Sequence, residues 1–405
     1  MSDGAVLRVV IVAESYLPYL SGVTISTDSL ARGLGAAGHN VLLVAPRSAG
    51  GAATTAVGST GPEPAYAWLP SYQPPPPAPR GYRMPWPVPS AALRVATAFK
   101  PDVVHAQSPF VAGLMARRLA QRTRTPLVFT HHTRFSDYGH YLGPLARPGS
   151  AIVEAYLRDF WAGCAAIVAP GSELADEIRV RLGARPGPVV RVIPTGVDLD
   201  AIRALPTPDL RAIAGWPPDA VVVASLGRLA PEKSMELLVD AFALAAGVDP
   251  RLRLVLVGGG PSEPALRDRA TQPGLAGRVH LSGQLPRLDG ISLIRGADLF
   301  AFASRTETQG LVLAEALSAG LPVVALEGPG VRDSVRDGID GVVVPAQPAG
   351  DRAARLAMAI GALAADPQHR SALASAAGEG AERFAAARRI EEMVALYREV
   401  LRSPR

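Results

Sequence analysis

Two glutamates, Glu307 and Glu315, lie eight positions apart in residues 304–325, SRTETQGLVLAEALSAGLPVVA. Glu307 follows a strand-sized apolar run, and Glu315 falls in the first turns of a helix that we expect to begin near Gln309 and Gly310. The amino end of such a helix offers backbone N–H groups and partial positive charge to a phosphate. Carboxylates accept hydrogen bonds from hydroxyl groups, so Glu315 suits a ribose and Glu307 a sugar. Two solvated acids at a helix start are the alternative interpretation.

Arg228 and Lys233 supply two positive charges after an expected strand that ends at Ser225 and before a helix. At a strand end beside a helix amino terminus, two cations suit a pyrophosphate, and they would stabilise the charge on a departing nucleotide without a metal. Lys233 stands out because the only other lysine in the chain is Lys100. The alternative is an exposed basic pair with no ligand.

Three histidines follow another expected strand, in residues 128–141, VFTHHTRFSDYGHY. A zinc site of His131, His132 and His140 is one alternative, but the sequence has no cysteine or carboxylate at the spacing usual in zinc sites, so we expect no metal. The single cysteine, Cys164, excludes an internal disulfide and fits a reducing compartment. We expect its thiol to be buried packing rather than a nucleophile.

Glycines follow two of the expected strands. Gly22 comes after the first strand, where the lack of a side chain lets the backbone approach a phosphate or a sugar. Residues 255–261, VLVGGGP, contain Gly258 and Gly260, but the third glycine of a dinucleotide fingerprint is replaced by Glu263, and no acidic residue suitably ends the next strand. A nicotinamide-dependent oxidoreductase is therefore disfavoured.

Alternating strands and helices position these residues in both halves of the chain. No hairpin signal interrupts the alternation outside residues 47–90, a Gly-, Thr- and Pro-rich stretch that we expect to be irregular and partly extended. Such a pattern predicts a parallel sheet covered on both faces, formed twice, with ligands beyond the carboxyl ends of the strands. The expected strands are 6–13, 41–45, 102–106, 127–130, 165–169 and 189–193 in the first half, and 221–225, 252–257, 279–281, 298–303, 322–325 and 341–344 in the second.

The ordered motifs resemble those of family 4 retaining glycosyltransferases, whose signature is a Glu, seven residues and a second Glu before a Gly-x-Pro-Val-Val strand. Nearly the whole chain takes part in the resemblance, through Gly22-Val23, residues 37–39, 101–105, 194–198 and 227–233, and the segment of Glu307 and Glu315. The resemblance implies the α/β GT-B fold of two Rossmann-like domains with a cleft between them. We expect an acceptor-binding domain at 1–193, a nucleotide-sugar-binding domain at 194–387, and a helix at 388–405 that crosses back to the first domain.

The resemblance also implies roles for single residues. His132 aligns best with the histidine that the family places near the reactive carbon of the donor sugar, whereas His131 could point into the core. Two positions depart from the family: Ser21 replaces the first glycine of a pair, and Ser234 replaces a glycine, where we expect it to cap a helix. The implied catalytic residues are His132, Arg228, Lys233 and Glu307, and the implied donor-binding residues are Gly22, Gly258, Gly259, Gln309, Gly310, Leu311 and Glu315, with no metal and no further cofactor.

Two finer features are similar to bacterial diacylglycerol glycosyltransferases. One is residues 306–311, with Gln309 where many relatives carry an aromatic residue; the other is His132-Thr133 followed by Asp137, Tyr138 and residues 140–142. This similarity implies UDP-glucose or UDP-galactose as donor, diacylglycerol as acceptor, an α-linked product, and a place at the cytoplasmic face of the membrane. A GDP-mannose-dependent enzyme acting on phosphatidylinositol or another lipid is the alternative.

The charge is uneven along the chain. Residues 1–193 hold 18 basic and 11 acidic side chains, and the remainder holds 23 and 25, within a net charge of +5. Residues 112–124, AGLMARRLAQRTR, set four arginines against Leu114, Met115 and Leu119, which predicts contact with an anionic bilayer, the alternative being an ordinary helix with a basic solvated face. We expect no secretory signal, no membrane-spanning run and no nucleic-acid partner.

The two glutamates also bear on stereochemistry. A double displacement needs a carboxylate nucleophile at the anomeric carbon. The resemblance places Glu307 on the donor hydroxyls instead, so we expect departure and attack on the same face, with the leaving phosphate taking the proton of the acceptor. A UDP-sugar 2-epimerase of the same architecture and a nucleotide-sugar-binding protein without turnover are the competing classes.

Overall fold

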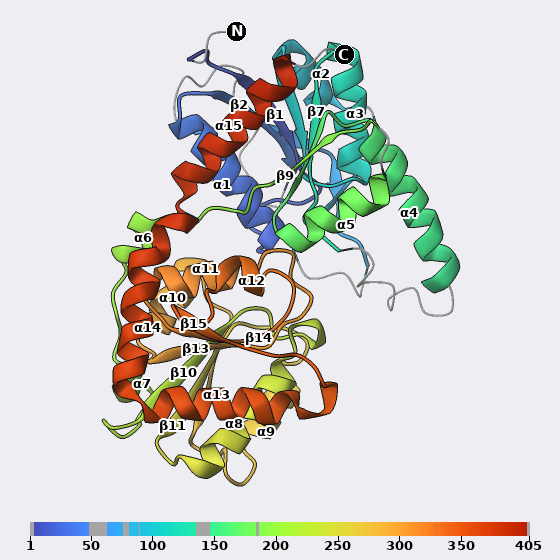
Figure 1. Cartoon of the computed structure of the whole chain (residues 1–405). Helices are drawn as coiled ribbons and strands as arrows, with labels where there is room; N and C mark the ends of the chain where they lie inside the picture. The colour runs from blue at the N-terminus through green and yellow to red at the C-terminus, as the bar shows by residue number, and fades with distance from the viewer. Residues whose placement is uncertain are drawn as a thin grey trace. The chain divides into compact units, whose positions relative to one another are not determined.

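A computed structural model describes residues 4–47, 63–75, 81–88, 90–134, 146–183 and 186–402, with the backbone alone at 146–150. The chain divides into two compact units, the first of residues 1–196 and 386–405 and the second of residues 197–385 (Figure 1). These boundaries lie two or three residues from those expected from sequence. Each unit is described by itself below.

The first unit contains a seven-stranded parallel sheet in the order β3-β2-β1-β6-β7-β8-β9. Its inner strands are buried at nearly every position, because helices cover both faces. The strands are β1 (Arg8–Val12), β2 (Asn40–Pro46), β3 (Ala65–Leu69), β6 (Val103–Ala106), β7 (Leu127–Thr130), β8 (Ala166–Ala169) and β9 (Val189–Val192). The helices are α1 (Gly22–Ala36), α2 (Ala91–Ala98), α3 (Val111–Thr123), α4 (Ala146–Ala162), α5 (Ser172–Leu182) and α15 (Ala386–Arg402).

The segment at 47–90, expected to be irregular and partly extended, contains a regular strand, β3, that the sequence-based expectation did not name. β3 pairs in parallel with β2, from Leu42 opposite Ala65 to Pro46 opposite Leu69, and forms one edge of the sheet. A two-stranded antiparallel ribbon of β4 (Ser71–Tyr72) and β5 (Met84–Pro85) follows. The neighbouring glycines and prolines obscured the five-residue alternation of β3 in the sequence.

Helix α3 buries two of the three apolar residues that the sequence set against a bilayer. Met115 and Leu119 belong to the hydrophobic core on one face of the first sheet, whereas Leu114 is exposed. The prediction of a bilayer-facing side for Met115 and Leu119 is therefore wrong, because the helix needs them to pack on the sheet.

The last helix, α15, packs on the first unit, as expected from the sequence. Figure 1 shows α15 (red) beside α1 (blue). The two helices approach so closely that a Cβ on Gly33 would lie 2.6 Å from Ile390. Tyr397 is fully buried, and its hydroxyl lies 2.6 Å from Nδ1 of His105 on β6. Ile390, Met393, Val394 and Tyr397 complete the core on this face of the sheet.

The second unit contains a six-stranded parallel sheet in the order β12-β11-β10-β13-β14-β15. The chain order reverses between β10 and β13, which are neighbours in the sheet, and such a switch point is where doubly wound sheets bind ligands. The strands are β10 (Val221–Leu226), β11 (Leu252–Val257), β12 (Val279–Gly283), β13 (Leu299–Phe302), β14 (Val323–Leu326) and β15 (Gly341–Val344).

Helices cover both faces of the second sheet, and a separate hydrophobic core lies on each face. They are α6 (Leu199–Arg203), α7 (Leu210–Ala214), α8 (Met235–Val248), α9 (Glu263–Ala270), α10 (Arg287–Arg295), α11 (Leu311–Ser318), α12 (Val331–Ser334), α13 (Arg352–Ala365) and α14 (Pro367–Glu379), with 3-10 turns η2 (Pro231–Lys233), η3 (Ala349–Asp351) and η4 (Gly380–Phe384). Within the described ranges, no helix combines the length and the hydropathy needed to cross a membrane.

Candidate functional site

Lys233 and Glu307 meet at the switch point of the second unit. Lys233 lies in the turn after β10 and Glu307 in the loop after β13, and Lys233 Nζ is 2.6 Å from Oε1 of Glu307. A second contact joins the same loops, because the Thr306 hydroxyl donates to the carbonyl of Glu232 at 2.9 Å. Arg228 is half exposed, with Nη1 3.5 Å from Oε1 of Glu232. Two cations and two carboxylates, those of Glu232 and Glu307, thus lie after β10 and β13.

Ser234 occupies the amino-terminal cap position of α8 as expected, but its hydroxyl does not cap the helix. Its backbone adopts the left-handed conformation, with φ of 54° and ψ of 37°, and its side chain makes no capping hydrogen bond to α8. Left-handed backbone favours glycine because Cβ crowds the following carbonyl in any other residue. The turn that carries Lys233 is therefore built with a strained serine.

The glycine loop after β11 packs on the turn after β10. A Cβ on Gly258 would overlap the carbonyl of Gly227, and one on Gly260 would overlap that of Leu229. Both glycines also have positive φ, and the Leu229 amide donates to the Gly259 carbonyl at 3.0 Å. The packing of two loops thus explains Gly258 and Gly260, whereas Gly259 has an ordinary φ and lies beside Gln284.

Helix α11 begins at Leu311, and Gly310 forms its amino-terminal cap with φ of 73°. The preceding residue, Gln309, is buried, and Gly330 lies so close that a Cβ there would be 2.5 Å from the Gln309 carbonyl. Glu315 lies on the buried side of α11 and is only 5% exposed. The alternative of two solvated acids is therefore wrong.

Arg287 contacts Glu315, a partner that sequence reasoning missed. Arg287 is the first residue of α10, and its Nε and Nη2 lie 2.7 and 2.6 Å from Oε1 of Glu315. Burial raises the pKa of the Glu315 carboxyl, and Arg287 opposes that shift. The only signal in the sequence was a basic residue after the end of β12, which is too common a feature to single out.

His132 follows β7 in the first unit, and its Nε2 lies 2.8 Å from Oε1 of Gln107, which follows β6. Burial lowers the pKa of His132 to about 4, so the imidazole is neutral near pH 7. The amide oxygen of Gln107 accepts only, and the proton therefore lies on Nε2 of His132. Gln107 was not among the residues expected from sequence.

His131 points into the core, where its ring lies 5.4 Å from the ring centroids of both Phe129 and Trp161. Burial lowers its pKa to about 3. The zinc alternative also used His140, which lies outside the described residues, as do Asp137, Tyr138 and residues 141–142. Among the described side chains, no cluster of three histidine, cysteine or acidic residues could hold a metal ion.

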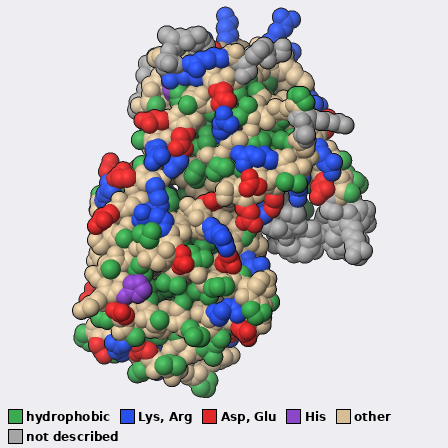
Figure 2. Space-filling view, in the orientation of Figure 1, with side chains coloured by type: hydrophobic (Ala, Val, Ile, Leu, Met, Phe, Trp, Pro, Cys, Tyr) green, Lys and Arg blue, Asp and Glu red, His purple; other side chains and the backbone are tan. Residues whose placement is uncertain are grey.

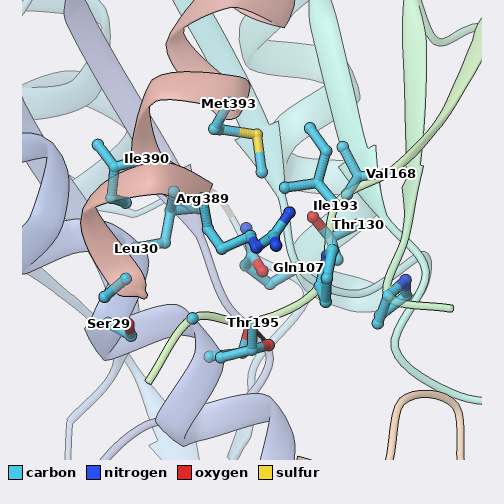
Figure 3. A pocket seen from close by; sticks show the side chains of 15 residues that line it. Ser29, Leu30, Gln107, Thr130, Val168, Ile193, Thr195, Arg389, Ile390 and Met393 are labelled. Atoms are coloured by element: carbon cyan, nitrogen blue, oxygen red, sulfur yellow. Dashed lines mark hydrogen bonds between the residues drawn. The ribbon is translucent and has the colours of Figure 1, made fainter. Parts of the chain in front are cut away.

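A cavity of about 30 Å³ with both polar and apolar lining lies beyond the carboxyl ends of β6, β7, β8 and β9 in the first unit. Figure 3 shows Gln107, Thr130, Thr195 and Arg389 along its wall, with Arg389 contributed by α15. Nε2 of Gln107 is buried and has no hydrogen-bond partner among the described residues. A cavity of this size and polarity accommodates about two water molecules.

Gly22 is the first residue of α1 rather than part of a loop, which corrects the sequence-based position. Ser21 caps this helix in a reciprocal pair with Thr24, at 3.2 Å from the Ser21 hydroxyl to the Thr24 amide and 2.9 Å in return. The serine that replaces the expected glycine therefore has a local role. No atom would lie within 4 Å of a Cβ on Gly22, so the backbone there is open.

Family models match both halves of the chain. The model described as Glycosyltransferase Family 4 matches residues 20–201, and that of Glycosyl transferases group 1 matches residues 206–379. Among solved structures, the chain is similar to sucrose-phosphate synthase from Thermosynechococcus elongatus, with a TM-score of 0.74 and 21% identity over 97% of this chain and 99% of that one. The complex of Anabaena HepE with UDP and glucose gives a TM-score of 0.71 and 19% identity over 97% and 100%.

Curated relatives carry two names. The alpha-monoglucosyldiacylglycerol synthase of Acholeplasma laidlawii is 28% identical over 83% of this chain and 84% of its own length. The synthase of that name from Streptococcus pneumoniae is 29% identical over 63% of this chain, which spans 58% of the length of that relative. The D-inositol 3-phosphate glycosyltransferase of Actinosynnema mirum is 34% identical over 73% of this chain and 72% of its own length.

Proposed function

This chain belongs to glycosyltransferase family 4 and has the GT-B fold, and we propose that it transfers glucose or galactose from the UDP-sugar to diacylglycerol. The product is an α-linked glycolipid. The observation that carries the donor side is the Lys233–Glu307 pair at the switch point of the second sheet. The similarity to two alpha-monoglucosyldiacylglycerol synthases supports the acceptor.

In this proposal, Arg228 and Lys233 bind the diphosphate of the donor. The lysine ammonium has three N–H donors, so it can retain Glu307 and still bind a phosphate oxygen. Glu307 accepts hydrogen bonds from the hydroxyls of the transferred sugar, and Glu315 from those of the ribose. We assign backbone contacts with the donor to Gly22, Gly258, Gly259, Gln309, Gly310 and Leu311.

We assign retention to departure and attack on one face of the sugar. Arg228 and Lys233 stabilise the charge that develops on the leaving phosphate, which takes the proton of the acceptor hydroxyl, so no metal and no protein general base is needed. His132 supports the positively charged sugar of the transition state as a neutral imidazole. A trapped glycosyl-enzyme on any residue would contradict this route.

Contact with the cytoplasmic face of an anionic membrane belongs to the same proposal. Phe110 and Leu114 are exposed at the start of α3, and Ile152 on α4 is 71% exposed. Arg118 and Arg122 are exposed on α3 as well, so apolar and basic side chains share this helix, as bilayer contact requires. Figure 2 shows basic and acidic side chains intermingled on the face that it draws.

A donor and acceptor screen tests the proposal. We expect the purified chain to transfer radiolabel from UDP-glucose or UDP-galactose to diacylglycerol in mixed micelles, with an α linkage by NMR. GDP-mannose with phosphatidylinositol tests the alternative donor, and D-inositol 3-phosphate tests the acceptor that the name of the Actinosynnema mirum relative suggests. Transfer only in either of those two arms would overturn the lipid assignment, and epimerised or hydrolysed donor without acceptor would overturn the transferase itself.

A further inference from the structure

Arg287 contacts only one of the two carboxylate oxygens of Glu315. Both Nε and Nη2 of Arg287 approach Oε1, at 2.7 and 2.6 Å. No described residue donates a hydrogen bond to Oε2 of Glu315. An arginine beside a carboxylate commonly contacts both oxygens in a forked pair, so a contact restricted to Oε1 keeps Oε2 for another donor.

We propose that Arg287 is a positioning residue that holds Oε1 of Glu315 so that Oε2 accepts hydrogen bonds from the vicinal hydroxyls of the donor's ribose. This inference rests on the proposed function, because it needs a nucleotide at the switch point. It concerns the ribose alone, which UDP and GDP share, and it therefore does not depend on which nucleotide carries the sugar.

Burial explains why Glu315 needs this partner. The glutamate lies on α11 between apolar residues that pack into the core, including Leu313 and Leu317. Burial raises the pKa of its carboxyl, and among the described charged groups only Arg287 acts against that shift. Without Arg287, the carboxyl gains a proton or turns towards water, and in either case it loses the fixed acceptor that a diol requires.

A purely structural role is the competing explanation, because Arg287 also joins α10 to α11. The two roles differ in what a missing ribose hydroxyl does. If Arg287 acts through the ribose, its removal costs affinity for UDP but not for 2′,3′-dideoxy-UDP. If Arg287 only joins two helices, its removal weakens the binding of UDP and of dideoxy-UDP equally, or changes neither.

The experiment measures binding of both nucleotides by calorimetry to the full chain and to Arg287→Gln, Arg287→Lys and Glu315→Gln. The matched control is Arg251→Gln. Arg251 directly precedes β11 and therefore lies at the amino ends of the strands, whereas Arg287 follows the carboxyl end of β12. We expect Arg287→Gln and Glu315→Gln to bind UDP about tenfold more weakly, since each removes a charge-assisted hydrogen bond. Their affinity for dideoxy-UDP should equal that of the unaltered protein, and Arg287→Lys should recover part of the loss for UDP.

Kinetics give a second readout. The donor KM of Arg287→Gln should rise by a factor similar to the loss of UDP affinity, with kcat within about twofold, because ribose contacts are made equally in the ground and transition states. Equal UDP affinity in Arg287→Gln, or equal losses for UDP and dideoxy-UDP, would overturn the inference and leave the proposed function standing. Failure of the unaltered protein to bind UDP would overturn the proposed function and, with it, the inference.

Discussion

Nζ of Lys233 lies 2.6 Å from Oε1 of Glu307, although 74 positions separate the two residues in the chain. Each residue follows a strand next to the point where the sheet order reverses. The ion pair fixes two side chains that are both mostly buried. A phosphate or a sugar hydroxyl that binds here would therefore meet charges already in position.

Removal of the lysine charge should therefore cost transfer activity. We expect Lys233→Met to lower kcat/KM by about 10²–10³, as for the loss of one group that stabilises charge on a leaving oxygen. Initial rates with the best donor of the screen check this. Lys100→Met, the other lysine of the chain, serves as control and should keep full activity. An unaltered rate for Lys233→Met would contradict the role given to Lys233.

Gln107 should support transfer activity through its contact with His132. Gln107→Leu removes the acceptor for Nε2–H of His132, so the ring loses one contact that fixes its tautomer and orientation. We expect kcat to fall about tenfold or more, in line with other partners that orient a functional histidine. The donor KM should change little. The control is Gln121→Leu, at an exposed position of α3. Equal kcat for both variants would show that the contact has no functional role.

Acid should destabilise the first unit. An unfolded histidine has a pKa of 6.5, whereas burial lowers the pKa of His105 and His131 to about 3 and that of His132 to about 4. Below pH 6.5 the unfolded chain binds more protons than the folded one, so stability is full above that pH and falls as the pH is lowered towards the folded values. Each histidine contributes up to about 1.4 kcal/mol per pH unit.

Urea unfolding at pH 7.5 and 5.0 measures this effect. In a Trp216→Phe variant, the three remaining tryptophans, Trp68, Trp86 and Trp161, all lie in the first unit, so fluorescence reports that unit alone. The expected result is a lower free energy of unfolding at pH 5.0. Equal free energies at the two pH values would show that these histidines are not buried in the neutral form.

Ser234→Gly should stabilise the second unit. Ser234 has left-handed backbone and no capping bond to lose, so glycine relieves about 1 kcal/mol of strain, less its own entropic cost. Ser234→Ala is the control and should bring no gain, because alanine keeps the Cβ. Trp216 fluorescence during urea unfolding reports on this unit. A destabilised Ser234→Gly variant would mean that the serine hydroxyl is needed after all.

The double variant Arg118→Glu, Arg122→Glu should bind anionic vesicles at least tenfold more weakly than the unaltered chain, since each basic residue near an anionic surface contributes about 1 kcal/mol. Flotation with vesicles containing phosphatidylglycerol measures the effect. Arg251→Glu, in the second unit, is the control. Vesicle binding by the double variant equal to that of the unaltered chain would place the membrane contact elsewhere.

The sequence by itself determined the two parallel sheets and the packing of the last helix on the first unit, and it singled out Arg228, Lys233, Glu307 and Glu315 as candidate site residues. Periodicity of apolar residues depends on neighbours in the chain, so the inner strands and the helices were predictable. The edge strand β3 was missed because its five residues lie among glycines and prolines.

Only the tertiary structure decided which of these side chains meet. Arg287 and Glu315 are 28 positions apart, and Gln107 and His132 are 25 apart. Such pairs form because the loops and helices that follow different strands converge at the carboxyl ends of the sheet, and the order of strands in that sheet is a property of global packing. The same reason applies to Gly258, whose need for glycine comes from the Gly227 carbonyl of another loop.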